Sequence, residues 1–201
     1  MLGPMAPFPI RPRTDSDLDG VADLLRVTHH SHAYPVILLA DLRTWGASED
    51  VIAAWVATDP GADHQVVGHV ALTETHDDPA TEQWVAATGL ARERLAVIRR
   101  LVVHERVQGS GTGRALLATA MDAAHALGRR TVLDMADNLV EAHALYLRNG
   151  FELIGAYEID LTEHLPTGQD DVEIHGTRTH HLNVLTWIGP EPPNRAEPSG
   201  P

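Results

Sequence analysis

The sequence contains no cysteine and no lysine, and these two absences already restrict its chemistry. Without cysteine there is no disulfide, no thiolate metal site and no cysteine nucleophile, which suits a reducing compartment and predicts a cytoplasmic protein. All 15 basic residues are arginine, so the phosphate-binding loop that ends on a lysine is excluded. A phosphate-bearing ligand would have to be held in another way.

Positive charge is scarce, and long apolar runs are missing. The chain has 28 acidic residues against 15 arginines, a formal net charge of -13, which disfavours binding to nucleic acid. No run of about 18 apolar residues occurs, and residues 1–12 are rich in proline rather than basic and then apolar. We therefore expect a protein that is neither secreted nor membrane-spanning.

The length of 201 residues and the 43% hydrophobic content fit one domain with a real core. Proline is concentrated at both ends of the chain, where apolar residues are few. We expect a flexible N-terminal segment at 1–8, a single domain at 9–189 and a flexible Pro-rich tail at 190–201.

Hydrophobic periodicity predicts an α/β or α+β domain of three layers with one mixed sheet. The expected strands are 10–13, 65–72, 94–104, 131–135, 151–160 and 181–188. The expected helices are one that begins at residue 14 or 15, a helical region at 35–57 interrupted near Gly46, and helices at 113–127 and 140–148. Residues 77–91 are expected to be irregular.

Three alternate glycines lie between the apolar run 101–103 and an amphipathic helix. Gly109, Gly111 and Gly113 let backbone N–H groups converge on an anion, and the first turn of the helix adds unpaired donors and the positive end of its dipole. This pattern predicts a cradle for a diphosphate. A tight strand-to-helix turn is the alternative, although one glycine would suffice for it.

A dinucleotide-binding fold is a second alternative for this segment. Asp134 follows at about the separation of a ribose-binding acid, but the fingerprint needs its third glycine at position 114, where this chain has Arg114. The spacing therefore disfavours a nucleotide-dependent oxidoreductase.

Two segments resemble the GNAT family of N-acetyltransferases. Gln108-Gly109-Ser110-Gly111-Thr112-Gly113 is similar to the acetyl-CoA pyrophosphate signature, and residues 142–151 are similar to the family segment Ala-x-x-Leu-Tyr-x-x-x-Gly-Phe. The resemblance is strongest over 97–158. It implies a central mixed, mostly antiparallel sheet flanked by helices, acetyl-CoA as the co-substrate, and no metal.

The resemblance also implies which residues hold acetyl-CoA. Leu101 and Val103 would offer main-chain groups to the pantetheine arm, with Val102 between them facing the other side. The family's asparagine seven residues before the tyrosine falls on Leu139 here, and we assign the adjacent Asn138 to the cofactor. The diphosphate would be held by Gln108, Gly109, Ser110, Gly111, Thr112, Gly113 and Arg114.

Tyr146 is implied to be the general acid that protonates the departing CoA thiolate. A phenol of pKa about 10 is a suitable donor to a thiolate of pKa about 8.5. The alternatives are an aromatic ring that only packs in the core, with the proton then supplied by water or His143.

The acceptor amine must lose a proton to become a nucleophile, and Glu74 is our candidate base. It follows the strand 65–72, which would lie beside Leu101–Val103 where the thioester sits. His69, His76 and His104 are rival candidates.

For the acceptor we expect a small cationic amine or a peptide amine, because the net charge of -13 attracts cations. Tyr34 and Trp45 are the candidate substrate contacts, and residues 29–45 and 77–91 are the expected walls of the acceptor groove.

Two histidine clusters, at 29–32 and 175–181, lack an acid at ligand spacing, so we assign no metal. A homodimer is possible. A catalytically silent acyl-CoA-binding or sensory module remains the alternative function, but it would not need Tyr146.

Overall fold

The computed structural model describes residues 7–32, 34–35, 37–39, 41–160, 173–174 and 179–190. The expected tail beyond 190 and most of the segment before residue 8 lie outside these ranges. The helices and strands are β1 (Ile10–Pro12), α1 (Leu18–His32), β2 (Ile37–Leu38), α2 (Leu42–Gly46), β3 (Val51–Asp59), β4 (Gln65–Thr73), α3 (Pro79–Thr88), β5 (Leu95–Val103), α4 (Thr112–Ala126), β6 (Arg130–Ala136), α5 (Val140–Arg148), β7 (Phe151–Asp160), β8 (Glu173–Ile174) and β9 (Thr179–Trp187).

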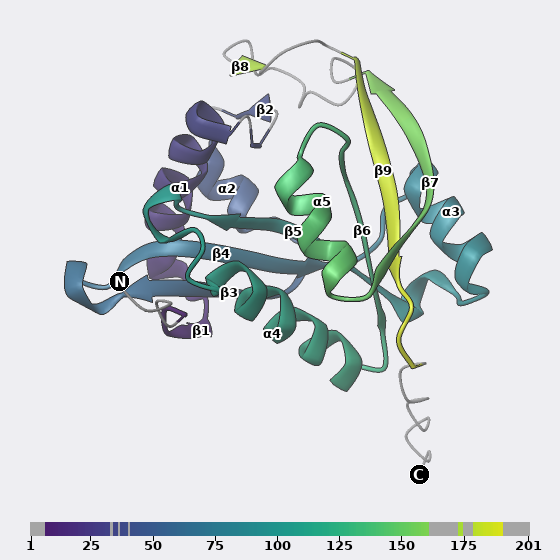
Figure 1. The fold of residues 1–201 in the computed structure, drawn as a ribbon, viewed down its shortest axis with the longest axis horizontal. Helices are drawn as coiled ribbons and strands as arrows, with labels where there is room; N and C mark the ends of the chain where they lie inside the picture. Colours follow the sequence, from purple (N-terminus) through teal and green to yellow (C-terminus); the bar gives the residue numbers. More distant parts are fainter. Residues whose placement is uncertain are drawn as a thin grey trace.

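Seven strands form one sheet in the order β1-β3-β4-β5-β6-β9-β7, and β2 pairs with β8 separately (Figure 1). Among the described strands only the pair β5 and β6 is parallel, and every other ladder is antiparallel. The expected fold class, a mixed and mostly antiparallel sheet flanked by helices, is therefore confirmed.

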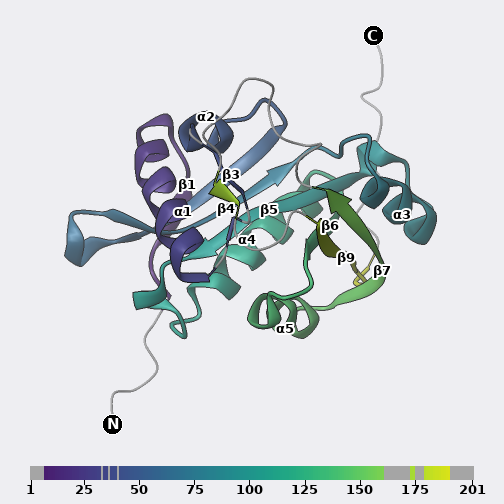
Figure 2. The same ribbon diagram turned by 90° about the horizontal axis from the view of Figure 1, so that it is seen from above.

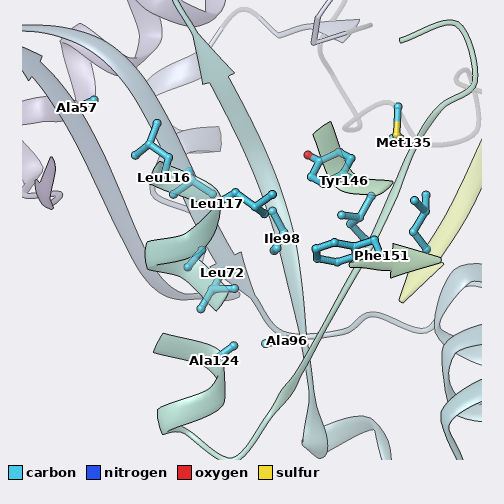
Figure 3. Packing of buried hydrophobic residues seen from close by; sticks show 14 of the residues in the cluster. Ala57, Leu72, Ala96, Ile98, Leu116, Leu117, Ala124, Met135, Tyr146 and Phe151 are labelled. Atoms are coloured by element: carbon cyan, nitrogen blue, oxygen red, sulfur yellow. The ribbon is translucent and has the colours of Figure 1, made fainter. Parts of the chain in front are cut away.

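The helices cover both faces of this sheet. α1 and α2 lie on one side, and α4 and α5 lie on the other (Figure 2). On the α4 and α5 side, Leu116 and Tyr146 pack with Leu72, Ile98 and neighbouring side chains (Figure 3). None of the described helices combines the length and hydropathy that a membrane span requires.

Residues 37–38 and 51–57 form strands, so the expected helical region at 35–57 is wrong at both of these segments. Only the short α2 is helical there, and β3 pairs with both β1 and β4. The run is apolar throughout and therefore fits a helix as well as a strand buried on both faces. Val51, Ile52 and Val56 are β-branched, which favours the strand.

Residues 79–88 form α3, where the sequence predicted irregular structure. The Asp78 carboxylate caps the helix by accepting the Thr81 N–H at 2.8 Å, Pro79 occupies the first turn, and Gly89 ends it with φ 67°. The helix was missed because Trp84 is its one large buried side chain, which gives little periodicity. The Trp84 indole donates to the Leu185 carbonyl at 3.1 Å.

The ladder between β5 and β6 is short. It joins Leu95, Ala96 and Val97 to residues 130–132, while β5 continues to Val103 and β6 to Ala136. The two strands diverge from there (Figure 1), and no described strand pairs with that edge of 98–103. The sheet therefore opens at its centre.

Trp84 provides a test of how α3 is held. We expect Trp84→Ala to lower the free energy of unfolding by about 3 to 5 kcal/mol, because it empties a fully buried site and removes the bond to Leu185. Val85→Ala changes the exposed neighbour and should cost about 0.5 kcal/mol or less. Urea unfolding measures both, and equal losses would contradict the observed packing of α3.

Candidate active site

β5 carries a β-bulge at the point where the sheet opens. His69 and Ala71 of β4 pair with Val102 and Arg99, so two residues of β5 stand opposite one residue of β4. Arg100 takes a left-handed backbone conformation, with φ 55°. A bulge bends its strand and increases the local twist, which accounts for the turn of β5 away from β6.

The bulge places two consecutive side chains on the same face. Ile98 and Leu101 pack into the core beneath α4, whereas Arg99 contacts Asp134 and Arg100 contacts Trp45 on the opposite face. In a regular strand, adjacent side chains would point to opposite faces. Two arginines thus reach the side of the sheet that carries α1 and α2.

Arg99 is balanced by a carboxylate across the opening. Its guanidinium lies 2.5 Å from the Asp134 carboxylate, which also accepts the Tyr157 hydroxyl at 2.7 Å. Burial opposes the charge of Arg99, but Asp134 raises the pKa of that arginine overall. Burial, Asp134 and the hydrogen bond raise the pKa of Tyr157, so its hydroxyl stays protonated.

No described carboxylate contacts Arg100. It is 6% exposed, its Nη2 donates to the Ser48 hydroxyl at 2.9 Å, and its guanidinium stacks 4.5 Å from the centre of the Trp45 ring. Its Nε and Nη1 are buried and have no hydrogen-bond partner among the described residues. Burial lowers the pKa of Arg100, although an arginine keeps its proton in proteins.

A polar chain leads from Arg100 to the surface. Ser48 donates to the Asp50 carboxylate, which also lies 3.1 Å from the ring of the exposed His76. Burial alone would raise the pKa of Asp50, but these hydrogen bonds and the charge of Arg100 lower it. Asp50 therefore acts on Arg100 through Ser48.

Tyr34 approaches the bulge from the segment after α1. Burial raises the pKa of Tyr34, and the charges of Arg100 and Arg99 together with the backbone N–H of Arg100 oppose this shift. Tyr34 and Trp45, the two predicted substrate contacts, thus meet at Arg100.

His69 lies beneath the bulge and is fully buried. Its Nδ1 lies 3.1 Å from the Arg100 carbonyl oxygen, and its Nε2 has no partner. Burial lowers the pKa of His69 to about 3, so the ring is neutral near pH 7 and holds a proton too weakly to act as a conventional base.

Tyr146 lies on α5, on the other face of the opening. Its ring packs edge-on against Phe151, with 5.6 Å between ring centres, and its hydroxyl points away from Phe151 (Figure 3). Burial, followed by the influence of Tyr34 and Asp134, raises the pKa of the Tyr146 hydroxyl. The ring is a core residue, and the hydroxyl has no hydrogen-bond partner among the described residues.

The glycine segment forms a cradle at the end of β5. Gly109 and Gly111 have φ values of 77° and 85°, which only glycine adopts without strain. Within the described ranges, the N–H groups of Gly109, Gly111, Gly113 and Arg114 have no acceptor. They surround the first turn of α4, where an anion is favoured.

Ser110 and Thr112 have their side chains turned inward. Their hydroxyl oxygens lie 2.7 Å apart, Ser110 donates to the Val107 carbonyl, and Thr112 accepts the Phe8 N–H at 3.2 Å. Phe8, expected in the flexible segment, is thus attached to the domain. These two hydroxyls therefore shape the cradle from behind.

Two further predicted cofactor contacts, Gln108 and Asn138, are polar side chains near the opening. The Gln108 side-chain amide lies 3.4 Å from the Val103 carbonyl oxygen, and Asn138 is exposed in the turn before α5. Leu101 and Val103 lie on the unpaired edge of β5. Val102 packs with α1 and α2 on the opposite face, as the alternation of the strand predicted.

Glu74 is not where we expected it. β4 runs antiparallel to β5, so its last residue, Thr73, pairs with Val97, and Leu101 and Val103 lie about 13 to 20 Å further along β5. Glu74 is half-exposed and forms an ion pair with Arg129. The structure therefore separates this carboxylate from the opening of the sheet.

The two expected walls of the acceptor groove differ in position. Both lie on the face opposite α4, but α3 packs against β7 and β9, whereas 29–45 supplies Tyr34 and Trp45 to the bulge.

Of the rival histidines, only His69 reaches the bulge. His76 is exposed, and His104 caps a short turn by accepting the Arg106 N–H.

The sequence analysis missed Arg99 and Arg100 as site residues. The signal was present, because β5 reads Leu-Ala-Val-Ile-Arg-Arg-Leu-Val-Val and two adjacent charges interrupt a buried strand. Buried arginines require partners or a function.

A central sheet that opens between two parallel strands, with an anion cradle at the end of one of them, defines the acetyltransferase fold. The acetyltransferase (GNAT) domain model matches residues 50–153, about half of the chain. The uncharacterized N-acetyltransferase YhbS of Escherichia coli K12 is 30% identical over 179 residues, which is 89% of this chain and 93% of YhbS.

Solved structures agree on the fold. YncA from Salmonella typhimurium, solved with its cofactor acetyl-CoA, has a TM-score of 0.63 and 15% identity over 96% of this chain and 99% of its own. The ribosomal-protein-S18-alanine N-acetyltransferase of E. coli has a TM-score of 0.58 and 17% identity over 89% of this chain and 92% of its own.

The chain belongs to the GNAT family of N-acetyltransferases. It is therefore an acyltransferase, and the predicted family and enzyme class are confirmed.

The Arg99–Asp134 pair can be tested by a double-mutant cycle. We expect Asp134→Asn to lower the free energy of unfolding by about 2 to 3 kcal/mol, because Arg99 is left partly buried without a counter-charge. Adding Arg99→Met should recover part of this loss, whereas additive losses in urea unfolding would show that the two groups do not interact. Asp137→Asn, an exposed neighbour, is the control.

Proposed function

We propose that this enzyme transfers the acetyl group of acetyl-CoA to a primary amine by direct attack, without a covalent enzyme intermediate. The observation that carries the proposal is the unpaired edge of β5 at 98–103, which ends at a cradle of free N–H groups and lies beside Tyr146. The family supplies the reaction class, and acetyl-CoA is the ligand of yncA.

Acetyl-CoA would bind as an added strand and an anion together. The amides of the pantetheine arm would pair with main-chain groups of Leu101 and Val103, which have no strand partner on that side among the described elements. The diphosphate would accept from the N–H groups of Gly109, Gly111, Gly113 and Arg114. The thioester then lies near the bulge.

The transfer exchanges one bond for another. The amine nitrogen attacks the thioester carbon and a C–N bond forms, after which the C–S bond breaks and the thiolate takes the Tyr146 proton. The attacking nitrogen loses one proton as the amide forms, and this proton returns to the Tyr146 oxygen through solvent, so the products are the amide and the CoA thiol. Burial, which raises the pKa of Tyr146, also disfavours a bare thiolate at the same place, so the proton transfer stays feasible.

Among the described residues no side chain at the bulge is placed to act as a strong base. We therefore infer that the ammonium form of the acceptor first loses a proton to solvent and then reacts as the neutral amine. The positive charges of Arg99 and Arg100 favour a neutral amine there. The rate should therefore rise with pH through the pKa of the bound amine.

The cradle can be tested by reversing one charge. Arg114 is exposed in the first turn of α4, and we expect Arg114→Glu to weaken CoA binding by about tenfold or more, since a carboxylate there repels the diphosphate. Stability should be maintained, because an acidic residue suits a helix N-terminus. Calorimetric titration with CoA measures the affinity.

Arg92→Glu is the matched control, because it makes the same charge change at an exposed site far along the sheet. It should leave the affinity within about twofold, because exposed charges this far apart are screened by salt. Equal affinities for CoA in the parent and in Arg114→Glu would show that the diphosphate does not bind at this turn.

Tyr146→Phe tests the general acid. The ring and its contact with Phe151 remain, so acetyl-CoA should still bind and raise the melting temperature. Turnover should fall by about 100-fold, near the lower end of the range for a general acid, since a thiolate is already a fair leaving group.

Thiol release with an accepted amine across pH 6 to 9 measures this loss. The loss should shrink with an acyl donor whose thiol is more acidic. If the variant turns over at the parent rate, the proton comes from water or from His143, three residues earlier on α5, and Tyr146 serves only packing.

A further inference from the structure

Arg100 is buried with an incomplete set of partners. Of its three guanidinium nitrogens, Nη2 bonds a hydroxyl, and Nε and Nη1 have no acceptor. A buried donor without an acceptor costs free energy, and a charged one costs more. A carboxylate oxygen is a matching acceptor, because its hydrogen bond to a guanidinium N–H is charge-assisted.

The arginines around the bulge differ in this respect. Arg99 is matched by Asp134 at 2.5 Å, and Arg13 donates to the Gly46 carbonyl. Arg100 has only the indirect influence of Asp50 through Ser48. The local positive charge is therefore least compensated at the residue with free donors.

The neighbours of Arg100 are the residues expected to contact the acceptor. Trp45 stacks on the guanidinium, and Tyr34 lies close enough for the charge of Arg100 to influence its phenol. Because the bulge that carries Arg100 also marks where β5 and β6 part, the guanidinium is anchored within one side-chain length of the proposed thioester site.

We propose that Arg100 binds the carboxylate of an acceptor that carries both an amine and a carboxylate, an amino acid in the broad sense. The carboxylate accepts from Nη1, at the tip of the guanidinium, and the amine reaches the thioester. This assignment rests on the proposed acetyl transfer and specifies its acceptor.

The net charge of the chain is compatible with such a substrate. A zwitterion has no net charge, so the formal charge of -13 does not repel it as it would an anion. A simple cationic amine would suit the surface but would leave the Arg100 donors unpaired and meet a positive site. The buried positive charge of Arg100 therefore favours an acceptor with a carboxylate over the purely cationic amine that the net charge suggested.

Matched acceptors provide the test. Thiol release from acetyl-CoA is followed with L-alanine, L-phenylalanine, β-alanine and γ-aminobutyrate, each compared with its carboxamide, and with spermidine. For at least one pair we expect kcat/KM to favour the carboxylate by about 10- to 100-fold, the value of charged hydrogen bonds. The ratio within a pair does not depend on how much of the enzyme is folded.

Arg100→Gln should reduce that ratio to about one, and Arg100→Lys, which keeps the charge but not the position of the Nη1 donor, should leave an intermediate value. Arg43→Gln is the control, because Arg43 is an exposed arginine on α2 paired with Asp19, and the ratio should not change. The melting shift with acetyl-CoA should survive in all three variants, since none contacts the cradle.

The outcomes separate the two proposals. Acetylation of spermidine or of the carboxamides at least as fast as the free acids would overturn the carboxylate assignment while acetyl transfer stands. An unchanged ratio in Arg100→Gln would also overturn it, as would an ordered water on Nε and Nη1 in a structure with the accepted acid. If acetyl-CoA binds and no amine releases thiol, the proposed function itself fails.

Discussion

The bulge at Arg100 is the constraint on which the rest of the site depends. A left-handed backbone at an arginine is a strained conformation, of the order of 1 to 3 kcal/mol, and it persists because β4 holds β5 on both sides of it. The same distortion turns β5 away from β6 and places two guanidinium groups on one face. One extra residue in β5 thus both opens the sheet and gives the site its two positively charged side chains.

The site shows why net charge is a poor guide to a buried pocket. The chain is strongly acidic as a whole, yet the side chains at the centre of the sheet include Arg99, Arg100 and a neutral His69. Surface charge governs encounter over distances set by salt screening. Which ligand binds is decided by the few groups within hydrogen-bond distance of that ligand. At this site the two arginines among these groups are positively charged, whereas the chain as a whole is negatively charged.

Local patterns predicted the parts of the site that are local. The apolar run 101–103, the alternate glycines and the segment around Tyr146 each lie within one short stretch, so their roles could be expected from the sequence alone. Glu74 could not be placed, because its distance from Leu101 depends on the direction in which β4 runs. Arg100 was missed for a related reason, since a bulge arises from pairing between strands. β3 and α3 were misassigned where periodicity was weak.

The two halves of the sheet are joined through three residue pairs between β5 and β6. Beyond Val97 no ladder joins the two described halves, although side chains from both halves still pack together beneath α4 and α5. A pantetheine chain bound in the opening would pair with the edge of β5 that β6 leaves unpaired. The donor would then support the sheet as well as react, and release of CoA after the reaction would leave the two strands connected across the opening by side-chain packing alone.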